Sequence, residues 1–127
     1  MISSDVLRGY NDLIILSILM DGDSYGYEVS KAILDRGGGV YHIKETTLYS
    51  AFNRLEANGY LVSYFGDETF GRRRTYFKIT ASGIQYYYDK CREWKLTKEL
   101  IEAFCLSRGE KNNMKNNKER GETNEQG

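Results

Sequence analysis

Apolar side chains recur at helical spacing in three stretches near the start of the chain. Residues 3–20 are apolar on nearly all sides in their second half, which predicts a mostly buried helix. Residues 24–36 carry a single apolar stripe and end at three consecutive glycines. Residues 46–57 repeat apolar side chains at i, i+4 and i+7 and end at an Asn-Gly pair, which favours helix termination. We therefore expect three successive helices.

Short polar side chains stand where three of the expected helices begin. Ser24 is placed to cap the second helix, Thr46 or Thr47 the third, and Thr80 a fourth that follows later in the chain. Each side-chain oxygen would accept a hydrogen bond from an N–H group that has no partner within the helix.

The periodicity changes from helical to alternating after the third helix. Residues 60–65 are rich in aromatic and β-branched side chains, 66–71 form an expected loop, and apolar and polar positions alternate over 72–80. This pattern predicts a β-hairpin with one face directed at the core. A long fourth helix is expected over about residues 81–106. Residues 107–127 contain one apolar side chain and no aromatic one, which predicts disorder.

Three helices followed by a hairpin are the arrangement of a winged helix, in which the third helix reads the DNA major groove and the hairpin is the wing. The predicted fold class is therefore mainly α with a β-hairpin: a winged helix-turn-helix followed by a long C-terminal dimerisation helix. The predicted domains are residues 1–80 for the winged helix, 81–106 for the dimerisation helix and 107–127 for the disordered tail.

The fourth helix carries apolar side chains at a heptad spacing, with Lys98 as the one polar residue in the series. A single helix in water cannot bury these side chains on a small domain that already has a core, so a second copy is expected to cover them. The residues expected at this dimer interface are Ile84, Tyr87, Tyr88, Cys91, Trp94, Ile101 and Cys105.

Basic residues are unevenly distributed, although the 127-residue chain carries no net charge. Residues 1–41 contain three basic and six acidic side chains, whereas residues 42–80 contain six basic and four acidic ones. Three of those six are the consecutive Arg72, Arg73 and Arg74, at the start of the second strand of the hairpin. Guanidinium groups bind phosphate oxygens through paired hydrogen bonds, which favours contact with a DNA backbone. The alternative is that the charges only keep an exposed hairpin soluble.

The expected third helix presents a polar outer face once its apolar side chains point inward. Side chains that donate and accept hydrogen bonds, without a carboxylate among them, suit base edges that lie between phosphates. Lys44, just before the helix, adds a cation to the same candidate surface. The outward residues are Thr46, Thr47, Tyr49, Ser50, Asn53 and Arg54.

Three segments together resemble the PadR family of bacterial transcriptional regulators: "SYGYEVSKAIL" at 24–34, "TTLYSAFNRLEANGYL" at 46–61 and "GRRRTYFKITASG" at 71–83. The resemblance covers about residues 5–106. It implies a winged-helix repressor of the small subfamily, which dimerises through a single C-terminal helix. Some small members bind flat hydrophobic molecules at the dimer interface beside a tryptophan, a place that Trp94 occupies here. The DNA contacts that the resemblance implies fall on Tyr25, Thr47, Tyr49, Ser50, Asn53, Arg72, Arg73 and Arg74.

We therefore predict a homodimeric, sequence-specific DNA-binding repressor. Its expected partner is a palindromic double-stranded operator. Trp94 is the candidate ligand-binding residue for a small aromatic effector; the alternative is that it only fills the dimer interface. One alternative is a winged helix that serves as a protein–protein interaction module without DNA binding. A weaker alternative is single-strand or RNA binding, because eleven tyrosines offer stacking surfaces. The adjacent arginines favour duplex DNA, since an interaction module has no need of them.

Catalysis has little support in the composition. His42 is the only histidine, so one chain cannot form a histidine-based catalytic constellation or a multi-histidine metal site. We predict no enzyme activity, cofactor or metal. The longest apolar run, Leu13–Met20, is too short for a membrane span. If Cys91 and Cys105 share one helix they lie about 21 Å apart, beyond disulfide reach, which indicates free thiols and a cytoplasmic location.

Overall fold

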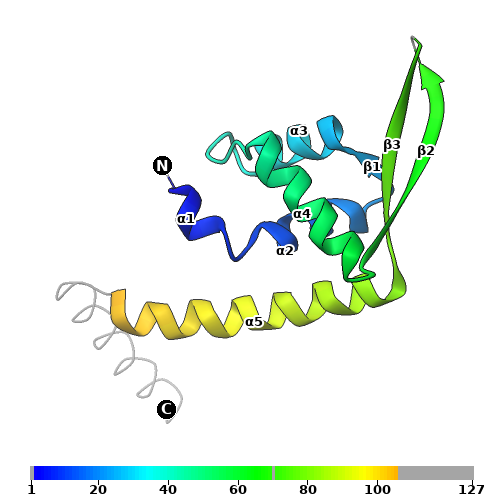
Figure 1. Cartoon of the computed structure of the whole chain (residues 1–127). Coiled ribbons are helices and arrows are strands. Elements are labelled where there is room, and N and C mark those ends of the chain that lie inside the picture. The colour runs from blue at the N-terminus through cyan, green and yellow to red at the C-terminus, as the bar shows by residue number, and fades with distance from the viewer. Residues whose placement is uncertain (1, 70, 106–127) are drawn as a thin grey trace, which may run out of the picture. The chain divides into compact units, whose positions relative to one another are not determined.

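The computed structural model describes residues 2–69 and 71–105, without the side chains of residues 68, 69 and 72. The chain divides into two units, Met1–Cys91 and Arg92–Gly127. Figure 1 shows the helices of the first unit gathered beside a β-hairpin whose tip extends beyond them. The tail predicted at residues 107–127 lies outside the described residues, and its expected disorder stays a prediction.

The expected first helix is interrupted by a turn. It is divided into α1 (Ser4–Leu7) and α2 (Asn11–Met20), with Gly9 in the turn between them. The prediction of one continuous helix is wrong here, and the physical reason is that a glycine inside a helix costs about 1 kcal/mol relative to alanine. The predicted burial of the second half is confirmed by the buried side chains of Ile15, Leu16 and Leu19.

The second helix begins later than expected, because Ser24 lies in a strand. Ser24 and Tyr25 form the short strand β1 (Ser24–Tyr25), and the Ser24 hydroxyl donates to the Glu28 carboxylate at 2.6 Å. The helix α3 (Gly26–Arg36) therefore starts without a side-chain cap, and the predicted cap by Ser24 is wrong. Its end at the three glycines is as predicted, since Gly38 and Gly39 have φ values of 66° and 79°.

The third helix, α4 (Glu45–Ala57), also starts without a side-chain cap. Lys44 is its N-cap residue, in an extended backbone conformation, and Thr46 and Thr47 already lie in the first turn. The prediction that one of these threonines caps the helix is therefore wrong. At the other end, Gly59 takes the left-handed conformation expected of the Asn-Gly pair, with φ of 79°.

The hairpin is longer than the sequence pattern predicts, because β2 (Leu61–Thr69) continues into the expected loop. It pairs antiparallel with β3 (Arg72–Ile79), and the register shifts between Phe65 and Glu68. On its other edge β3 pairs antiparallel with β1, so the sheet has the strand order β1-β3-β2. The strand β1 was not predicted, because two residues are too few to show an alternating pattern.

The core joins the helices to one face of the sheet. The rings of Phe52 in α4 and Phe77 in β3 stack with centroids 3.9 Å apart, and both are buried. The last helix, α5 (Ala81–Cys105), begins beneath the hairpin, where Gly83 N–H donates to the Thr80 hydroxyl as predicted. The Tyr86 ring stacks on Tyr60 with centroids 4.1 Å apart. The predicted fold class, a winged helix followed by a long helix, is confirmed.

Candidate nucleic-acid interface

The helix α4 has one buried face and one polar face. Figure 1 shows it lying between α1 on one side and the β2–β3 hairpin on the other. The buried side chains are Leu48, Ala51, Phe52 and Leu55. The predicted reading residues Thr46, Tyr49, Ser50, Asn53 and Arg54 are exposed, and Thr47 is half-buried. Their contact with DNA stays a prediction, although their exposure leaves the helix face open to a partner.

Tyr49 is held in place by its neighbours. Its ring meets Phe52 edge-on, with centroids 5.7 Å apart. On its other side lies Gly26 of α3, where an added Cβ would overlap the Tyr49 hydroxyl and ring. Gly26 is itself buried, so it is the small residue that lets Tyr49 lie across the start of α3.

Arg54 already has a strong partner within the chain. Its guanidinium donates two hydrogen bonds to the Asp12 carboxylate of α2, one from Nη2 to Oδ1 and one from Nε to Oδ2 at 3.4 Å. This hydrogen bonding raises the pKa of the Arg54 guanidinium. Half of the Arg54 side chain remains exposed, but a phosphate would have to compete with a carboxylate for it.

The two wing arginines whose side chains are described each lie over an aromatic ring. The Arg74 guanidinium carbon is 4.4 Å from the centroid of Tyr25, and that of Arg73 is 5.5 Å from the centroid of Phe65. Because Arg73 and Arg74 are neighbours in a strand, they extend from opposite faces of the hairpin, as predicted. The side chain of Arg72 lies outside the described residues.

A row of three tyrosines crosses the sheet beneath Arg74. Tyr76 is paired with Tyr25 on one side and with Tyr64 on the other, at centroid distances of 5.4 and 5.7 Å. The Tyr64 hydroxyl donates to Asp23 at 2.6 Å, and this hydrogen bond raises the pKa of the phenol. An added Cβ at Gly66 would overlap the Tyr76 ring. The predicted DNA-binding residue Tyr25 is therefore also a support for Arg74.

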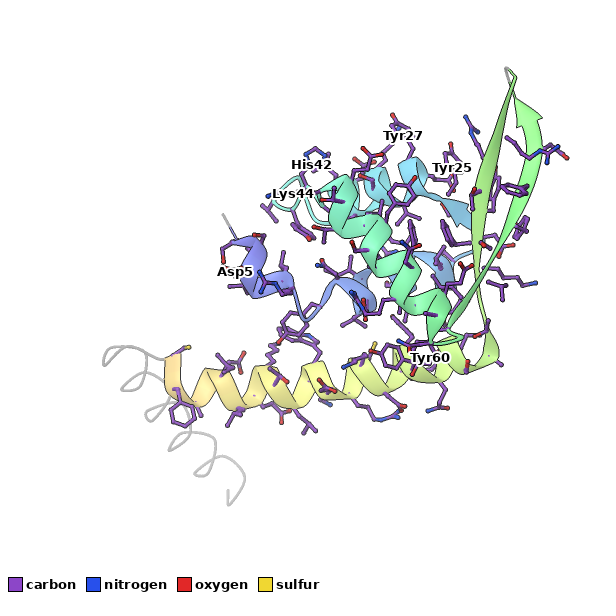
Figure 2. All side chains as sticks on the ribbon, in the orientation of Figure 1. Asp5, Tyr25, Tyr27, His42, Lys44 and Tyr60 are labelled. Atoms are coloured by element: carbon purple, nitrogen blue, oxygen red, sulfur yellow. The ribbon has the colours of Figure 1, made fainter. Side chains whose placement is uncertain are left out.

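Two exposed aromatic residues near the predicted DNA-binding residues were missed from the sequence: Tyr27 and Phe65. Figure 2 shows Tyr25, Tyr27, His42 and Lys44 along the edge that α3 and the start of α4 share. Tyr27 is 72% exposed, and Phe65 on the wing is 67% exposed. Exposed aromatic side chains beside cations suit stacking or backbone contact. The alternation in the Tyr-Gly-Tyr segment could have indicated that Tyr27 is exposed. Nothing in the sequence indicates the exposure of Phe65.

The residues predicted at the dimer interface fall into two groups along α5. Tyr87 packs against the core of the first unit, and Cys91 is half-buried. The others are exposed side chains: Ile84, Tyr88, Trp94, Ile101 and Cys105. Three further apolar side chains, Leu96, Leu100 and Phe104, are 67%, 60% and 78% exposed. They recur every four residues and were missed because they lie outside the heptad series.

An apolar pocket of about 430 Å³ lies in the first unit. Its lining includes Leu13 and Ile14 of α2, Val40, and Tyr87 and Cys91 of α5. A hydrogen bond with Cys91 is the main cause that raises the pKa of the Tyr87 phenol. Apart from Arg36 and a few hydroxyl groups the lining is apolar, so the pocket suits an apolar partner and not a phosphate.

Within residues 2–69 and 71–105, no group of three or more His, Cys, Asp or Glu side chains is placed to hold a metal ion. Over the same residues, no helix is both long and apolar enough to cross a membrane. Cys91 and Cys105 are free thiols.

Comparisons with known proteins point to one kind of protein. Residues 15–89 match the model of the transcriptional regulator PadR-like family. An uncharacterized protein of Lysinibacillus sphaericus is 41% identical over 104 residues, which are 82% of this chain and 95% of the relative. The structure of a transcriptional regulator from Clostridium thermocellum is 61% identical, with a TM-score of 0.78 over 84% of this chain and 100% of that one. A PadR family transcription regulator from hypervirulent Clostridium difficile is 34% identical, with a TM-score of 0.67 over 77% and 100% of the two chains.

Proposed function

Because the chain belongs to the PadR-like family of transcriptional regulators, which are not enzymes, we propose that this DNA-binding regulator is a dimeric repressor that occupies a palindromic operator in the cytoplasm. One observation carries the proposal. The exposed polar face of α4 lies in the same unit as wing arginines that are supported by aromatic rings. A helix of this kind with a cationic hairpin beside it fits a major groove and an adjacent backbone.

Base reading is assigned to the centre of the α4 face. Asn53 offers the donor and acceptor pair that recognises adenine in the major groove, and Ser50 accepts or donates. Tyr49, held between Gly26 and Phe52, would contact the groove wall with little loss of side-chain entropy. Arg54 is given a smaller part, because Asp12 already occupies its guanidinium.

Phosphate binding is assigned to the wing. Stacking on Tyr25 and Phe65 limits the directions in which Arg74 and Arg73 can point, so less entropy is lost when a phosphate binds. Contacts of this kind position the protein on the duplex and contribute little to sequence preference.

The assignment is tested by the salt dependence of duplex binding. Arg74→Ala should weaken binding to specific and unrelated duplexes to a similar degree. It should also flatten the slope of log K against log salt by about 0.9 for each phosphate that a subunit no longer neutralises. Lys78→Ala is the matched control, because Lys78 is an exposed cation on the same strand, nearer the base of the hairpin. An unchanged slope in Arg74→Ala, with wild-type affinity, would show that the wing only keeps the protein soluble.

Dimerisation is assigned to α5. The second unit exposes Leu96, Leu100 and Phe104 on its helix, and water is an unfavourable environment for such a row. A second copy has a matching surface in its own apolar pocket, whose lining is largely aliphatic. The proposed dimer places this part of one α5 against the pocket of the partner.

An effector is proposed beside Trp94, which is 44% exposed on the dimerising helix. A planar aromatic molecule stacked on the indole would gain about 0.5–1.5 kcal/mol beyond area burial. If it favours one separation of the two reading helices, it must change operator affinity, and operator must change its affinity equally. Trp94 is the only tryptophan, so its fluorescence reports this site alone. Titration with planar aromatic dyes should quench it at micromolar concentrations and shift DNA affinity; quenching without such a shift would contradict the effector role.

A further inference from the structure

Two small polar pockets lie on the side of α4 that faces α1. One, of about 250 Å³, has Arg8, His42, Lys44 and Thr47 in its lining. The other, of about 220 Å³, has Arg8, Thr46, Thr47, Ser50 and Arg54 in its lining. They share Arg8, Asn11 and Thr47, so they form one continuous surface, which we call the α1 flank.

The chemistry of the α1 flank suits a phosphate oxygen. Cations reach it from separate parts of the chain: Arg8 from the turn after α1, Lys44 from the start of α4, and Arg54 from within α4. Threonine and serine hydroxyls lie among them, and no carboxylate is found among the described residues that line either pocket. Cations with hydroxyl donors are the groups that bind nucleic-acid backbones.

The position of the α1 flank indicates which phosphates it would meet. A helix in the major groove has a phosphate backbone on each side of it, with the groove about 12 Å wide. Figure 1 shows the wing on one side of α4 and α1 on the other. The α1 flank therefore faces the backbone that the wing does not reach.

We propose that Arg8, together with Lys44 and Thr47, binds the DNA backbone on the side of the major groove opposite the wing. Arg8 is the new residue in this assignment, and it makes α1 part of the DNA-binding surface. The proposal rests on the proposed DNA binding by α4. Backbone contacts on both sides of the groove would fix the register of α4 better than a contact on one side.

Arg8 is available to a phosphate in a way that Arg54 is not. The Arg8 Nη2 atom is 2.7 Å from Asp5 Oδ1, and both side chains are 80% exposed. Exposed ion pairs contribute little, so the backbone can displace the carboxylate. Arg54 is held by Asp12, whose side chain is only 18% exposed. Asp5 is thus an internal competitor for Arg8, and its removal should strengthen DNA binding.

The chain contains a matched control pair. Lys31 of α3 is an exposed cation and Asp21 is a carboxylate with a 76% exposed side chain, and neither lines the α1 flank or the apolar pocket. The experiment compares Arg8→Gln with Lys31→Gln, and Asp5→Asn with Asp21→Asn, in the full-length protein. Each variant is first checked for wild-type thermal unfolding and oligomeric state, which exposed substitutions should leave unchanged.

Two measurements are made on each variant with a duplex that wild-type protein binds. Arg8→Gln should flatten the log K against log salt slope by about 0.9 in each subunit, as expected for one phosphate. In Arg8→Gln, interference by phosphate ethylation should disappear at certain phosphates of the duplex. These should lie across the major groove from the phosphates at which Arg74→Ala abolishes interference. Asp5→Asn should bind several-fold more tightly than Asp21→Asn, and the Lys31 and Asp21 controls should match wild type.

The outcomes separate this inference from the function on which it rests. If wild-type protein binds no duplex, both fail. If wild-type protein binds and Arg74→Ala flattens the slope, but Arg8→Gln keeps the wild-type slope and interference pattern, DNA binding stands and the α1 flank is overturned. The assignment is supported if interference at the phosphates opposite the wing disappears in Arg8→Gln and persists in the control variants and in Arg74→Ala.

Discussion

The position of Tyr49 on the outer face of α4 depends on a residue of another helix. Gly26 is the first residue of α3, and the absence of a Cβ there leaves room for the tyrosine ring and hydroxyl. Gly66 does the same for Tyr76, the middle tyrosine of the row beneath Arg74. In both cases a glycine sets the direction of an aromatic side chain at the candidate interface.

Gly26→Ala is expected to destabilise the fold by about 1–3 kcal/mol, because the added methyl group overlaps the Tyr49 ring and forces one of the two to move. The same substitution in a Tyr49→Ala background should cost much less, because the overlapping atoms are gone. A double-mutant cycle of chemical denaturation free energies measures the difference.

DNA affinity supplies the second readout for this pair. Gly26→Ala should weaken DNA binding by about as much as Tyr49→Ala does, since both remove the tyrosine from its place. Additive stabilities in the cycle would contradict the packing account, because they would mean that Gly26 and Tyr49 act independently.

At the scale of elements, the two parts of α5 differ in their surroundings: its beginning packs against the winged helix, and its later part is exposed. Its beginning is joined to the hairpin through the Thr80 cap, the close approach of Gly83 to the Tyr60 carbonyl and the stacking of Tyr86 on Tyr60. Beyond Cys91 the helix exposes its apolar side chains. The first part supports the winged helix, and the second is the part available to a partner.

Leu100→Lys is expected to convert the proposed dimer to a monomer at micromolar concentration, because a cation would replace an apolar side chain at the centre of the exposed row. Glu102→Lys is the control, since residue 102 lies about 200° further around the helix and away from the row. Sedimentation velocity distinguishes the two species. A Leu100→Lys protein that remains dimeric, with Glu102→Lys unchanged, would rule out this face of α5 as the interface.

The elements themselves were largely predictable because their side-chain periodicities are strong. The core face of α4 and the alternation of β3 each appear directly in the order of residues. What the pattern could not show depends on contacts distant in sequence. Ser24 is drawn into a strand by pairing with Phe77, and Arg54 is occupied by Asp12, forty-two residues away.

The candidate site was predictable in part, for the same physical reason. Exposed polar residues on a helix follow from its periodicity, so the exposure of the polar face of α4 was predicted from the sequence. The support of Arg74 by Tyr25 depends on the strand order β1-β3-β2, and the place of Arg8 beside Thr47 depends on packing of the first helices against α4. Neither arrangement leaves a local signal in the chain.

At the scale of the whole molecule, the proposed regulator uses three surfaces: the face of α4, the wing and the exposed part of α5. A two-fold dimer presents two copies of α4 to one side of a duplex, so its operator should be a palindrome with half-sites about 10–10.5 base pairs apart or a multiple of this spacing. In this proposal the α4 face determines sequence preference, the wing determines the salt dependence of binding, and the exposed part of α5 determines the spacing of the half-sites.

Selection of bound fragments from random duplex DNA tests the central claim most directly. Wild-type protein should enrich an inverted repeat with half-sites about one helical turn or a multiple of it apart. Asn53→Ala should enrich the same spacing with relaxed preference at one base pair per half-site, corresponding to about 1–3 kcal/mol of lost discrimination. No enrichment by wild-type protein, or the same preference in wild type and Asn53→Ala, would contradict the assignment of α4 as the helix that reads DNA.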